Sequence, residues 1–138
     1  MQPHDGFFRL VFGSPVHARA AIRALLPELA ARLNLNRLTV LNGTFVDAEL
    51  SRRHSDVCLS TYLDDHEALI YVLLEHQSSP DPLMPWRMLR YVVRVWERHL
   101  TEHPKATRLP LVVPVVVHQG ERPWSTPTEL RDLIDVDS

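Results

Sequence analysis

The sequence predicts an α/β domain in which helices flank a small mixed sheet. Three observations predict this fold: helical apolar spacing after Pro15, two β-rich runs around a short polar loop, and a long helical segment followed by an apolar β-branched run. The 138 residues are 45% hydrophobic and 23% charged, which suits one globular domain with a single core.

Two short helices are expected near the start of the chain. Ser14 is a cap residue and Pro15 suits the first position of a helix, after which apolar residues recur at helical spacing. Pro27 breaks this pattern, but it also suits the first turn of a second helix. The two helices should therefore meet at Leu26-Pro27.

A first strand should follow these helices. Residues 38–41 are β-compatible, Asn42-Gly43 is a strong turn dipeptide, and residues 44–46 resume an extended pattern. The segment is expected to form a bent strand or a small hairpin.

Residues 56–63 and 68–75 should form a central hairpin. Both runs are rich in β-formers, and the polar residues 64–67 between them suit a four-residue loop. A hairpin that turns symmetrically about the bond between Asp65 and His66 places Asp56 directly opposite Glu75.

A long helix and a last strand complete the order helix-strand-strand-strand-helix-strand. The helix should run from Pro85 to about His99. Its buried face is expected to carry four apolar residues: Leu89, Val93, Trp96 and Leu100. Residues 111–118 are almost wholly apolar and β-branched, which indicates a central strand with an irregularity at Pro114.

Charge and cysteine content limit the function classes. The net charge of −2 gives no basic field, so any contact with nucleic acid must come from a local patch. The single cysteine, Cys58, is expected to be a small buried hydrophobe, which fits a reducing cytosol. Neither a signal peptide nor a membrane span is indicated, and the expected localisation is cytoplasmic.

The predicted register brings two carboxylates together. Asp56 and Glu75 would repel each other as cross-strand neighbours unless a divalent cation compensates. Gln77 falls on the same side as Glu75, whereas His76 points the other way. Such hard oxygen ligands suit Mg²⁺ first and Mn²⁺ second. Because the two carboxylates would repel each other, removing either one is expected to relieve that repulsion without unfolding the protein. The alternative is that Asp56 and Glu75 are ordinary polar residues at strand ends.

Several stretches carry a resemblance to a known family. They are His4-Asp5-Gly6-Phe7-Phe8, Ser55-Asp56, the run from Tyr71 to Ser79 with Asp81 and Met84, the run from Arg87 to Tyr91, and the run from Leu109 to Glu121 with Trp124. In these stretches the chain resembles the recombination-promoting nucleases, or YhgA-like transposases, of the PD-(D/E)XK superfamily. Glu75-His76-Gln77-Ser78, in that context, is the most specific match.

The resemblance implies a restriction-endonuclease-like core in which Asp56 matches the superfamily's aspartate and Glu75-x-Gln77 matches its (D/E)-x-K motif. It implies a hydrolase, a Mg²⁺-dependent DNA endonuclease linked to DNA recombination and transposition. Asp56, Glu75 and the backbone carbonyl of His76 would hold the metal, and Gln77 would hydrogen-bond the attacking water. Because an amide lacks the charge of the superfamily's lysine, the alternative is a catalytically weak DNA-binding or protein-interaction domain on a nuclease fold.

Arginines of the long helix are the candidate DNA contacts. Arg87, Arg90 and Arg94 lie with Arg98 within about a quarter-turn of one helical face, where they could bind phosphates. Such a row is equally the ordinary solvated side of a helix.

The resemblance also bears on the extent of the chain and its partners. It implies that residues 1–138 form a single nuclease domain that is the N-terminal part of a longer protein. Asp5 and Glu28 are candidates for an extra acidic residue near the metal, and the alternative for both is a cap or surface role. The expected partner is DNA and not a membrane, and a homodimer is left open.

Overall fold

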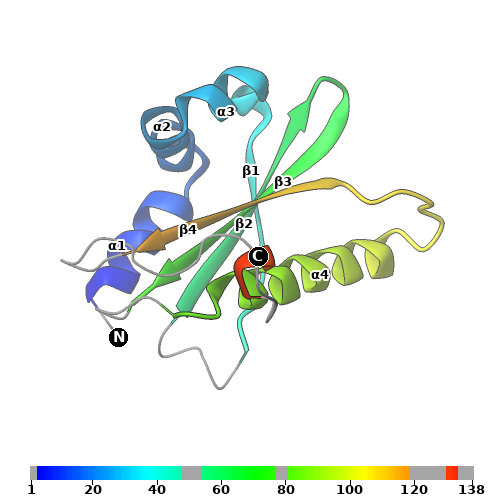
Figure 1. Ribbon diagram of the computed structural model, residues 1–138. Helices are drawn as coiled ribbons and strands as arrows, with labels where there is room; N and C mark the ends of the chain where they lie inside the picture. The colour runs from blue at the N-terminus through cyan, green and yellow to red at the C-terminus, as the bar shows by residue number, and fades with distance from the viewer. Residues whose placement is uncertain (1–2, 48–53, 77–80, 119–129, 134–138) are drawn as a thin grey trace.

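The protein folds into three layers, a sheet between two groups of helices, in a computed structural model that describes residues 3–47, 54–76, 81–118 and 130–133 (Figure 1). The helical elements are α1 (Pro3–Phe12), α2 (Pro15–Leu25), α3 (Pro27–Arg32), η1 (Leu35–Arg37), α4 (Met84–Glu102) and η3 (Leu130–Leu133). The strands are β1 (Thr39–Leu41), β2 (His54–Leu63), β3 (His66–Glu75) and β4 (Leu111–His118). No described helix is long and apolar enough to cross a membrane.

The sheet is mixed and has the strand order β1-β2-β3-β4. The first three strands form an antiparallel meander, and β4 runs parallel to β3. A parallel pair needs a crossover connection, which α4 supplies. The predicted α/β class and the order helix-strand-strand-strand-helix-strand are confirmed.

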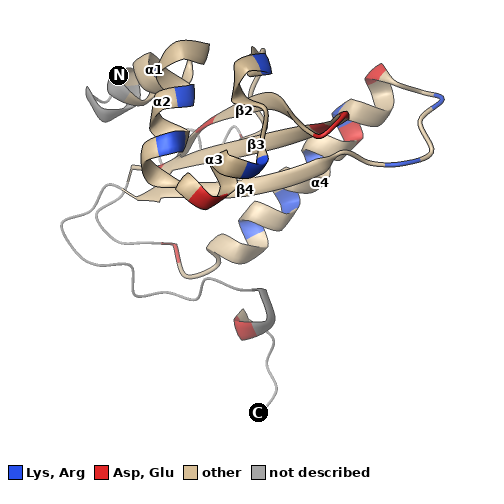
Figure 2. Ribbon diagram, turned by 90° about the horizontal axis from the view of Figure 1, so that it is seen from above, with Lys and Arg blue, Asp and Glu red and all other residues tan. Residues whose placement is uncertain are grey.

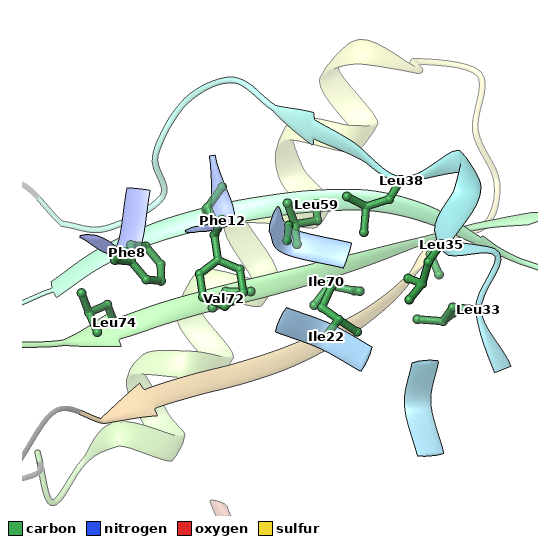
Figure 3. Close-up of a cluster of buried hydrophobic side chains, with 13 residues drawn as sticks. Phe8, Phe12, Ile22, Leu33, Leu35, Leu38, Leu59, Ile70, Val72 and Leu74 are labelled. Atoms are coloured by element: carbon green, nitrogen blue, oxygen red, sulfur yellow. The ribbon is translucent and has the colours of Figure 1, made fainter. Parts of the chain in front are cut away.

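Two apolar clusters attach the helices to the two faces of the sheet. The first lies between β2–β3 and the N-terminal helices (Figure 3), and the side chains labelled there are Phe8, Phe12, Ile22, Leu33, Leu35, Leu38, Leu59, Ile70, Val72 and Leu74. The second lies on the opposite face, under α4, and its members on that helix are Met84, Met88, Tyr91, Val92 and Val95.

The predicted register of the central hairpin is wrong by two residues. Leu63 pairs with His66, so the turn consists of two residues rather than four. Asp64 adopts a left-handed backbone, with φ of 55°, which aspartate tolerates better than most residues and which allows the tighter turn. Asp56 therefore lies opposite Leu73 rather than opposite Glu75.

The N-terminal region is only partly as predicted. The helices that begin at Pro15 and Pro27 are confirmed, but α1 and η1 were not predicted. Gly6 lowers the helix propensity of α1. The helix forms because buried Phe8 and Phe12 pack it on the sheet, which compensates for the low propensity. The first strand is also shorter than expected, since it ends at Leu41 and residues 44–46 are not a strand.

Three of the four residues predicted on the buried face of α4 are exposed: Leu89, Val93 and Leu100. Trp96 is partly buried and packs against the second cluster, whose members on α4 are the residues of the helix that face the sheet. The helix carries two apolar stripes, so periodicity alone could not decide which one faces the sheet.

The last strand has the predicted residues but not the predicted place. Within the described sheet, β4 lies at the edge rather than in the centre. An edge position tolerates the missing N–H of Pro114, which explains a proline in an otherwise regular strand. Cys58, in β2, is buried as predicted.

Candidate active site

Asp56 and Glu75 lie on the same face of the sheet, the face that α4 covers. Even positions of β2 and odd positions of β3 point to this face, as buried Cys58 and Tyr71 show. A shift of two residues preserves this alternation, so the register error changes the pairing but not the face. The two residues are diagonal neighbours, roughly 7–8 Å apart by standard sheet geometry, with their Cβ atoms somewhat closer.

Three hydrogen bonds hold the carboxylate of Asp56. The Thr44 hydroxyl donates to Oδ1 at 2.5 Å, and the Phe45 backbone N–H and the Tyr71 hydroxyl donate to Oδ2 at 2.8 and 2.6 Å. Burial, together with the nearby Asp56 charge, raises the pKa of Tyr71 far above its usual range, so the phenol keeps its proton and remains a donor. Asp56 is 1% exposed, and its orientation is fixed.

These bonds make Asp56 structural as well as a candidate ligand. Deleting its carboxylate would leave two buried donors, the Phe45 N–H and the Tyr71 hydroxyl, without their acceptor, and each such loss costs about 1–3 kcal/mol. The expectation that removing this carboxylate merely relieves repulsion is therefore wrong for Asp56, because neutral donors surround it and Glu75 is not its direct neighbour.

Glu75 has a buried histidine as its cross-strand partner. His54 Nε2 lies 2.8 Å from Glu75 Oε2, and the two residues are 2% and 0% exposed. The Nδ1 atom of His54 is buried and has no hydrogen-bond partner among the described residues. His54 was not predicted as a site residue, although its position two residues before Asp56, on the same face, is the signal that could have identified it.

The other motif residues lie apart from this pair. His76 points to the opposite face, as predicted, and its Nε2 lies 2.8 Å from the hydroxyl oxygen of Ser55. Gln77 lies outside the described residues. Glu28 is exposed on α3, which packs against the opposite face, and the side chain of Asp5 is not among those described.

Basic residues recur along α4 (Figure 2), and the arginines of this row bond to neighbouring segments. Arg94 donates to the Phe45 carbonyl oxygen at 2.8 Å and pairs with Asp47, which also lies 3.4 Å from Arg90. The two remaining members also bond within the chain. Arg87 pairs with Asp81, and Arg98 donates to the Asn42 carbonyl oxygen. Arg90, Arg94 and Arg98 thus clamp the segment after β1, the same segment that donates to Asp56. DNA contact by Arg87, Arg90 and Arg94 stays a prediction.

Arg94→Ala should lower the free energy of unfolding by about 1–2 kcal/mol, because it removes a charged donor from the Phe45 carbonyl and an ion pair with partly buried Asp47. Urea denaturation measures the change. Arg23→Ala, on the exposed surface of α2, is the matched control and should change stability little. Equal effects of the two substitutions would contradict the clamp.

The described residues supply only part of a metal centre. No group of three His, Cys, Asp or Glu residues in the described ranges could hold a metal ion. Asp56 does fit a hard cation, because each carboxylate oxygen has two acceptor sites and Oδ1 receives only the Thr44 hydroxyl among described donors. A cation held by Asp56 and Glu75 would need further ligands from backbone, water or residues not described.

A pocket on the opposite face is a poor alternative site. It lies between α2 and the sheet, and its lining is almost wholly apolar, with Phe12, Ile22, Leu26, Ile70 and Val115 among its residues. Such a lining offers neither metal ligands nor charged groups for phosphate.

Comparisons with known proteins match the chain to one family. The family model described as "Putative transposase, YhgA-like" matches residues 2–138. The recombination-promoting nuclease RpnD of Escherichia coli O157:H7 is 38% identical over 127 residues, covering 89% of this chain and 48% of RpnD. RpnC of Escherichia coli K12 is 37% identical over 121 residues, which are 86% of this chain and 39% of RpnC.

A third relative carries a different name. The inactive recombination-promoting nuclease-like protein RpnE of Escherichia coli K12 is 35% identical over 120 residues, covering 86% of this chain and 40% of RpnE. The chain thus spans less than half the length of these relatives. No solved structure matches it.

Proposed function

The chain belongs to the YhgA-like transposase family, and from this membership we propose that it is a metal-dependent endonuclease that hydrolyses phosphodiester bonds of DNA during recombination or transposition. One observation carries the proposal. Asp56 and Glu75, the residues that resemble the superfamily's acidic pair, are buried on one face of adjacent strands. The names of RpnD and RpnC, recombination-promoting nucleases, support the same activity.

The proposed cation is Mg²⁺, with Mn²⁺ as the second choice, held by Asp56, Glu75 and the backbone carbonyl of His76. Carboxylate and carbonyl oxygens are the ligands that these hard ions prefer. When bound, such an ion activates water and shields the charge that develops on the phosphate. Gln77 is proposed to hydrogen-bond the attacking water, since an amide can orient water although it cannot supply charge.

The remaining side chains hold the two carboxylates in place. Thr44, Phe45 and Tyr71 fix both oxygens of Asp56, which leaves Oδ1 with capacity for one more contact. His54 holds Oε2 of Glu75 from the neighbouring strand. Carboxylates that are oriented before the substrate arrives need no reorganisation during the reaction, which favours catalysis.

His54 is therefore proposed as a positioning residue for Glu75. His54→Phe should weaken Mn²⁺ binding about tenfold or more, because hydrogen-bond partners of ligating carboxylates contribute on that scale. Calorimetric titration measures the affinity, and thermal melting verifies the fold. His54→Gln keeps an N–H donor and should recover most of the affinity. Wild-type affinity in a folded His54→Phe variant would exclude the positioning role.

The activity itself is tested with supercoiled plasmid DNA. The proposal expects nicked or linear DNA in Mg²⁺ or Mn²⁺, and no conversion when a chelator is added. Lack of cleavage in either metal by the folded chain would reject the endonuclease.

The second candidate is a DNA-binding module that has lost efficient chemistry. The amide at Gln77 in place of the superfamily's lysine favours it, as does the name of the inactive relative RpnE. DNA binding in chelator without cleavage in metal would identify this case. The proposed DNA contacts are then Arg87, Arg90 and Arg94, and Gln77→Lys is the substitution expected to raise activity.

A further inference from the structure

Three residues of α4 surround the carboxylate of Asp47. Arg94 pairs with it, and Arg90 Nη1 lies 3.4 Å from its Oδ2 atom. Burial raises the pKa of Tyr91, and the Asp47 charge is the next largest cause, so the phenol lies close to that carboxylate. Residues three and four apart are neighbours on a helix, so these three side chains share one side of α4.

Asp47 leaves hydrogen-bonding groups of this cluster unused. Its Oδ2 atom is buried and has no hydrogen-bond partner among the described residues, although Arg90 is near. The Tyr91 hydroxyl is likewise buried and makes no hydrogen bond within the part of the chain that the structure describes. Buried polar groups are nearly always hydrogen-bonded, so two such groups in one place require an explanation. A carboxylate fits this cluster poorly.

The cluster is positively charged and open to solvent. Two arginines share the single carboxylate of Asp47, and each guanidinium has five N–H donors, more than these contacts use. The side chains of Arg90 and Arg94 are 35% and 31% exposed, so an anion from solvent can reach both. Arginine is the residue best suited to bind phosphate oxygens through paired N–H groups.

The cluster adjoins the candidate active site. Arg94 donates to the Phe45 carbonyl oxygen, and the N–H of the same residue donates to Asp56, each at 2.8 Å. The rings of Tyr91 and Tyr71 have centroids 6.1 Å apart, and the Tyr71 hydroxyl also donates to Asp56. An anion held by the cluster would therefore lie beside the carboxylate proposed to hold the metal.

We infer that Arg90, Arg94 and the Tyr91 hydroxyl form a phosphate site for the DNA backbone, and that Asp47 occupies this site in the free protein. A phosphodiester spreads its charge over two oxygens on a tetrahedral centre, so it can accept from both arginines and from the phenol. The inference rests on the proposed function for its ligand, DNA. Because DNA must displace Asp47 from the arginines, Asp47 lowers the affinity for DNA.

Asp47→Asn tests the competition between Asp47 and DNA. The amide keeps the size of the side chain and an acceptor for Arg94 but loses the charge, so DNA should bind about fivefold or more tightly. Fluorescence anisotropy of a labelled duplex, in chelator and at one fixed salt concentration, measures affinity without cleavage. Asp65→Asn removes the same charge in the exposed hairpin turn and should change affinity less than about twofold.

Tyr91→Phe separates DNA binding from folding. The substitution removes a buried hydroxyl that has no hydrogen bond among the described residues, so stability in urea should stay the same or rise slightly. DNA binding should weaken about tenfold, because a hydrogen bond to a charged group contributes on that scale. Tyr62→Phe is the matched control, since Tyr62 lies next to the hairpin turn, and it should bind DNA like the wild type.

Three results would overturn the inference: an Asp47→Asn gain no larger than that of Asp65→Asn, wild-type DNA affinity in a folded Tyr91→Phe variant, or no binding of the duplex by either the wild type or Asp47→Asn. Plasmid cleavage judges the endonuclease separately. The expected changes in binding without cleavage would support the phosphate site and reject the nuclease. Cleavage by the wild type with neither change would support the nuclease and reject the phosphate site.

Discussion

Glu75→Gln is expected to lower the rate of DNA cleavage at least about a thousand-fold, or ~4 kcal/mol of transition-state stabilisation, while the fold survives. The amide keeps the shape of the side chain, and its oxygen can still accept from His54 Nε2. What it loses is the negative charge proposed to hold the cation. Initial rates on supercoiled plasmid, compared at equal folded fraction, measure the effect.

The control for this substitution is Glu102→Gln. Glu102 is half exposed and pairs with Arg98. It is the last residue of α4, and its substitution removes one carboxylate charge outside the proposed metal site. It should cleave like the wild type. If Glu75→Gln also kept its rate within a few-fold, Glu75 would be a buried structural residue and the proposed site would be wrong.

Asp56→Ala should destabilise the protein by about 2–6 kcal/mol, a large part of the stability of an ordinary domain. The substitution removes the acceptor of the Thr44 hydroxyl, the Phe45 N–H and the Tyr71 hydroxyl at once. Asp56→Asn keeps one acceptor oxygen and should therefore be less destabilising. Both variants should lose cleavage, because neither has the carboxylate charge.

Urea denaturation and plasmid cleavage separate the two roles of Asp56. The expected order of stability is wild type, then Asn, then Ala, with both variants inactive. Asp65→Ala, in the exposed hairpin turn, is the control and should retain activity and nearly all stability. An Asp56→Ala variant as stable as the wild type would contradict the buried hydrogen-bond cluster, and an active Asp56→Asn variant would contradict the catalytic role.

Local sequence signals predicted where helices and strands lie better than they predicted how the strands pair. The prolines at positions 15 and 27 and the β-branched run of β4 mark their elements directly, because these residue types restrict the backbone. The hairpin register depended on one residue, Asp64, whose left-handed backbone shortens the turn. Side-chain alternation survived that error, so Asp56 and Glu75 were correctly expected on one face.

The supporting residues of the site could not be predicted from spacing. Thr44 and Phe45 reach Asp56 from a segment outside the hairpin, and Tyr71 does so from within an apolar run that signals only core. These contacts depend on how β1 pairs with β2 and on how α4 packs on the sheet. The arginines of α4 are a similar case, since their bonds to Phe45, Asp47 and Asn42 are visible only in three dimensions.

Calorimetric titration of Mn²⁺ into the folded chain tests the central claim most directly, because it measures the metal site without requiring DNA or turnover. The wild type and Glu102→Gln should bind Mn²⁺ with the same affinity, and Glu75→Gln should show no measurable binding under the same conditions. Equal Mn²⁺ affinity in the wild type and Glu75→Gln, both folded, would contradict a metal centre at Asp56 and Glu75.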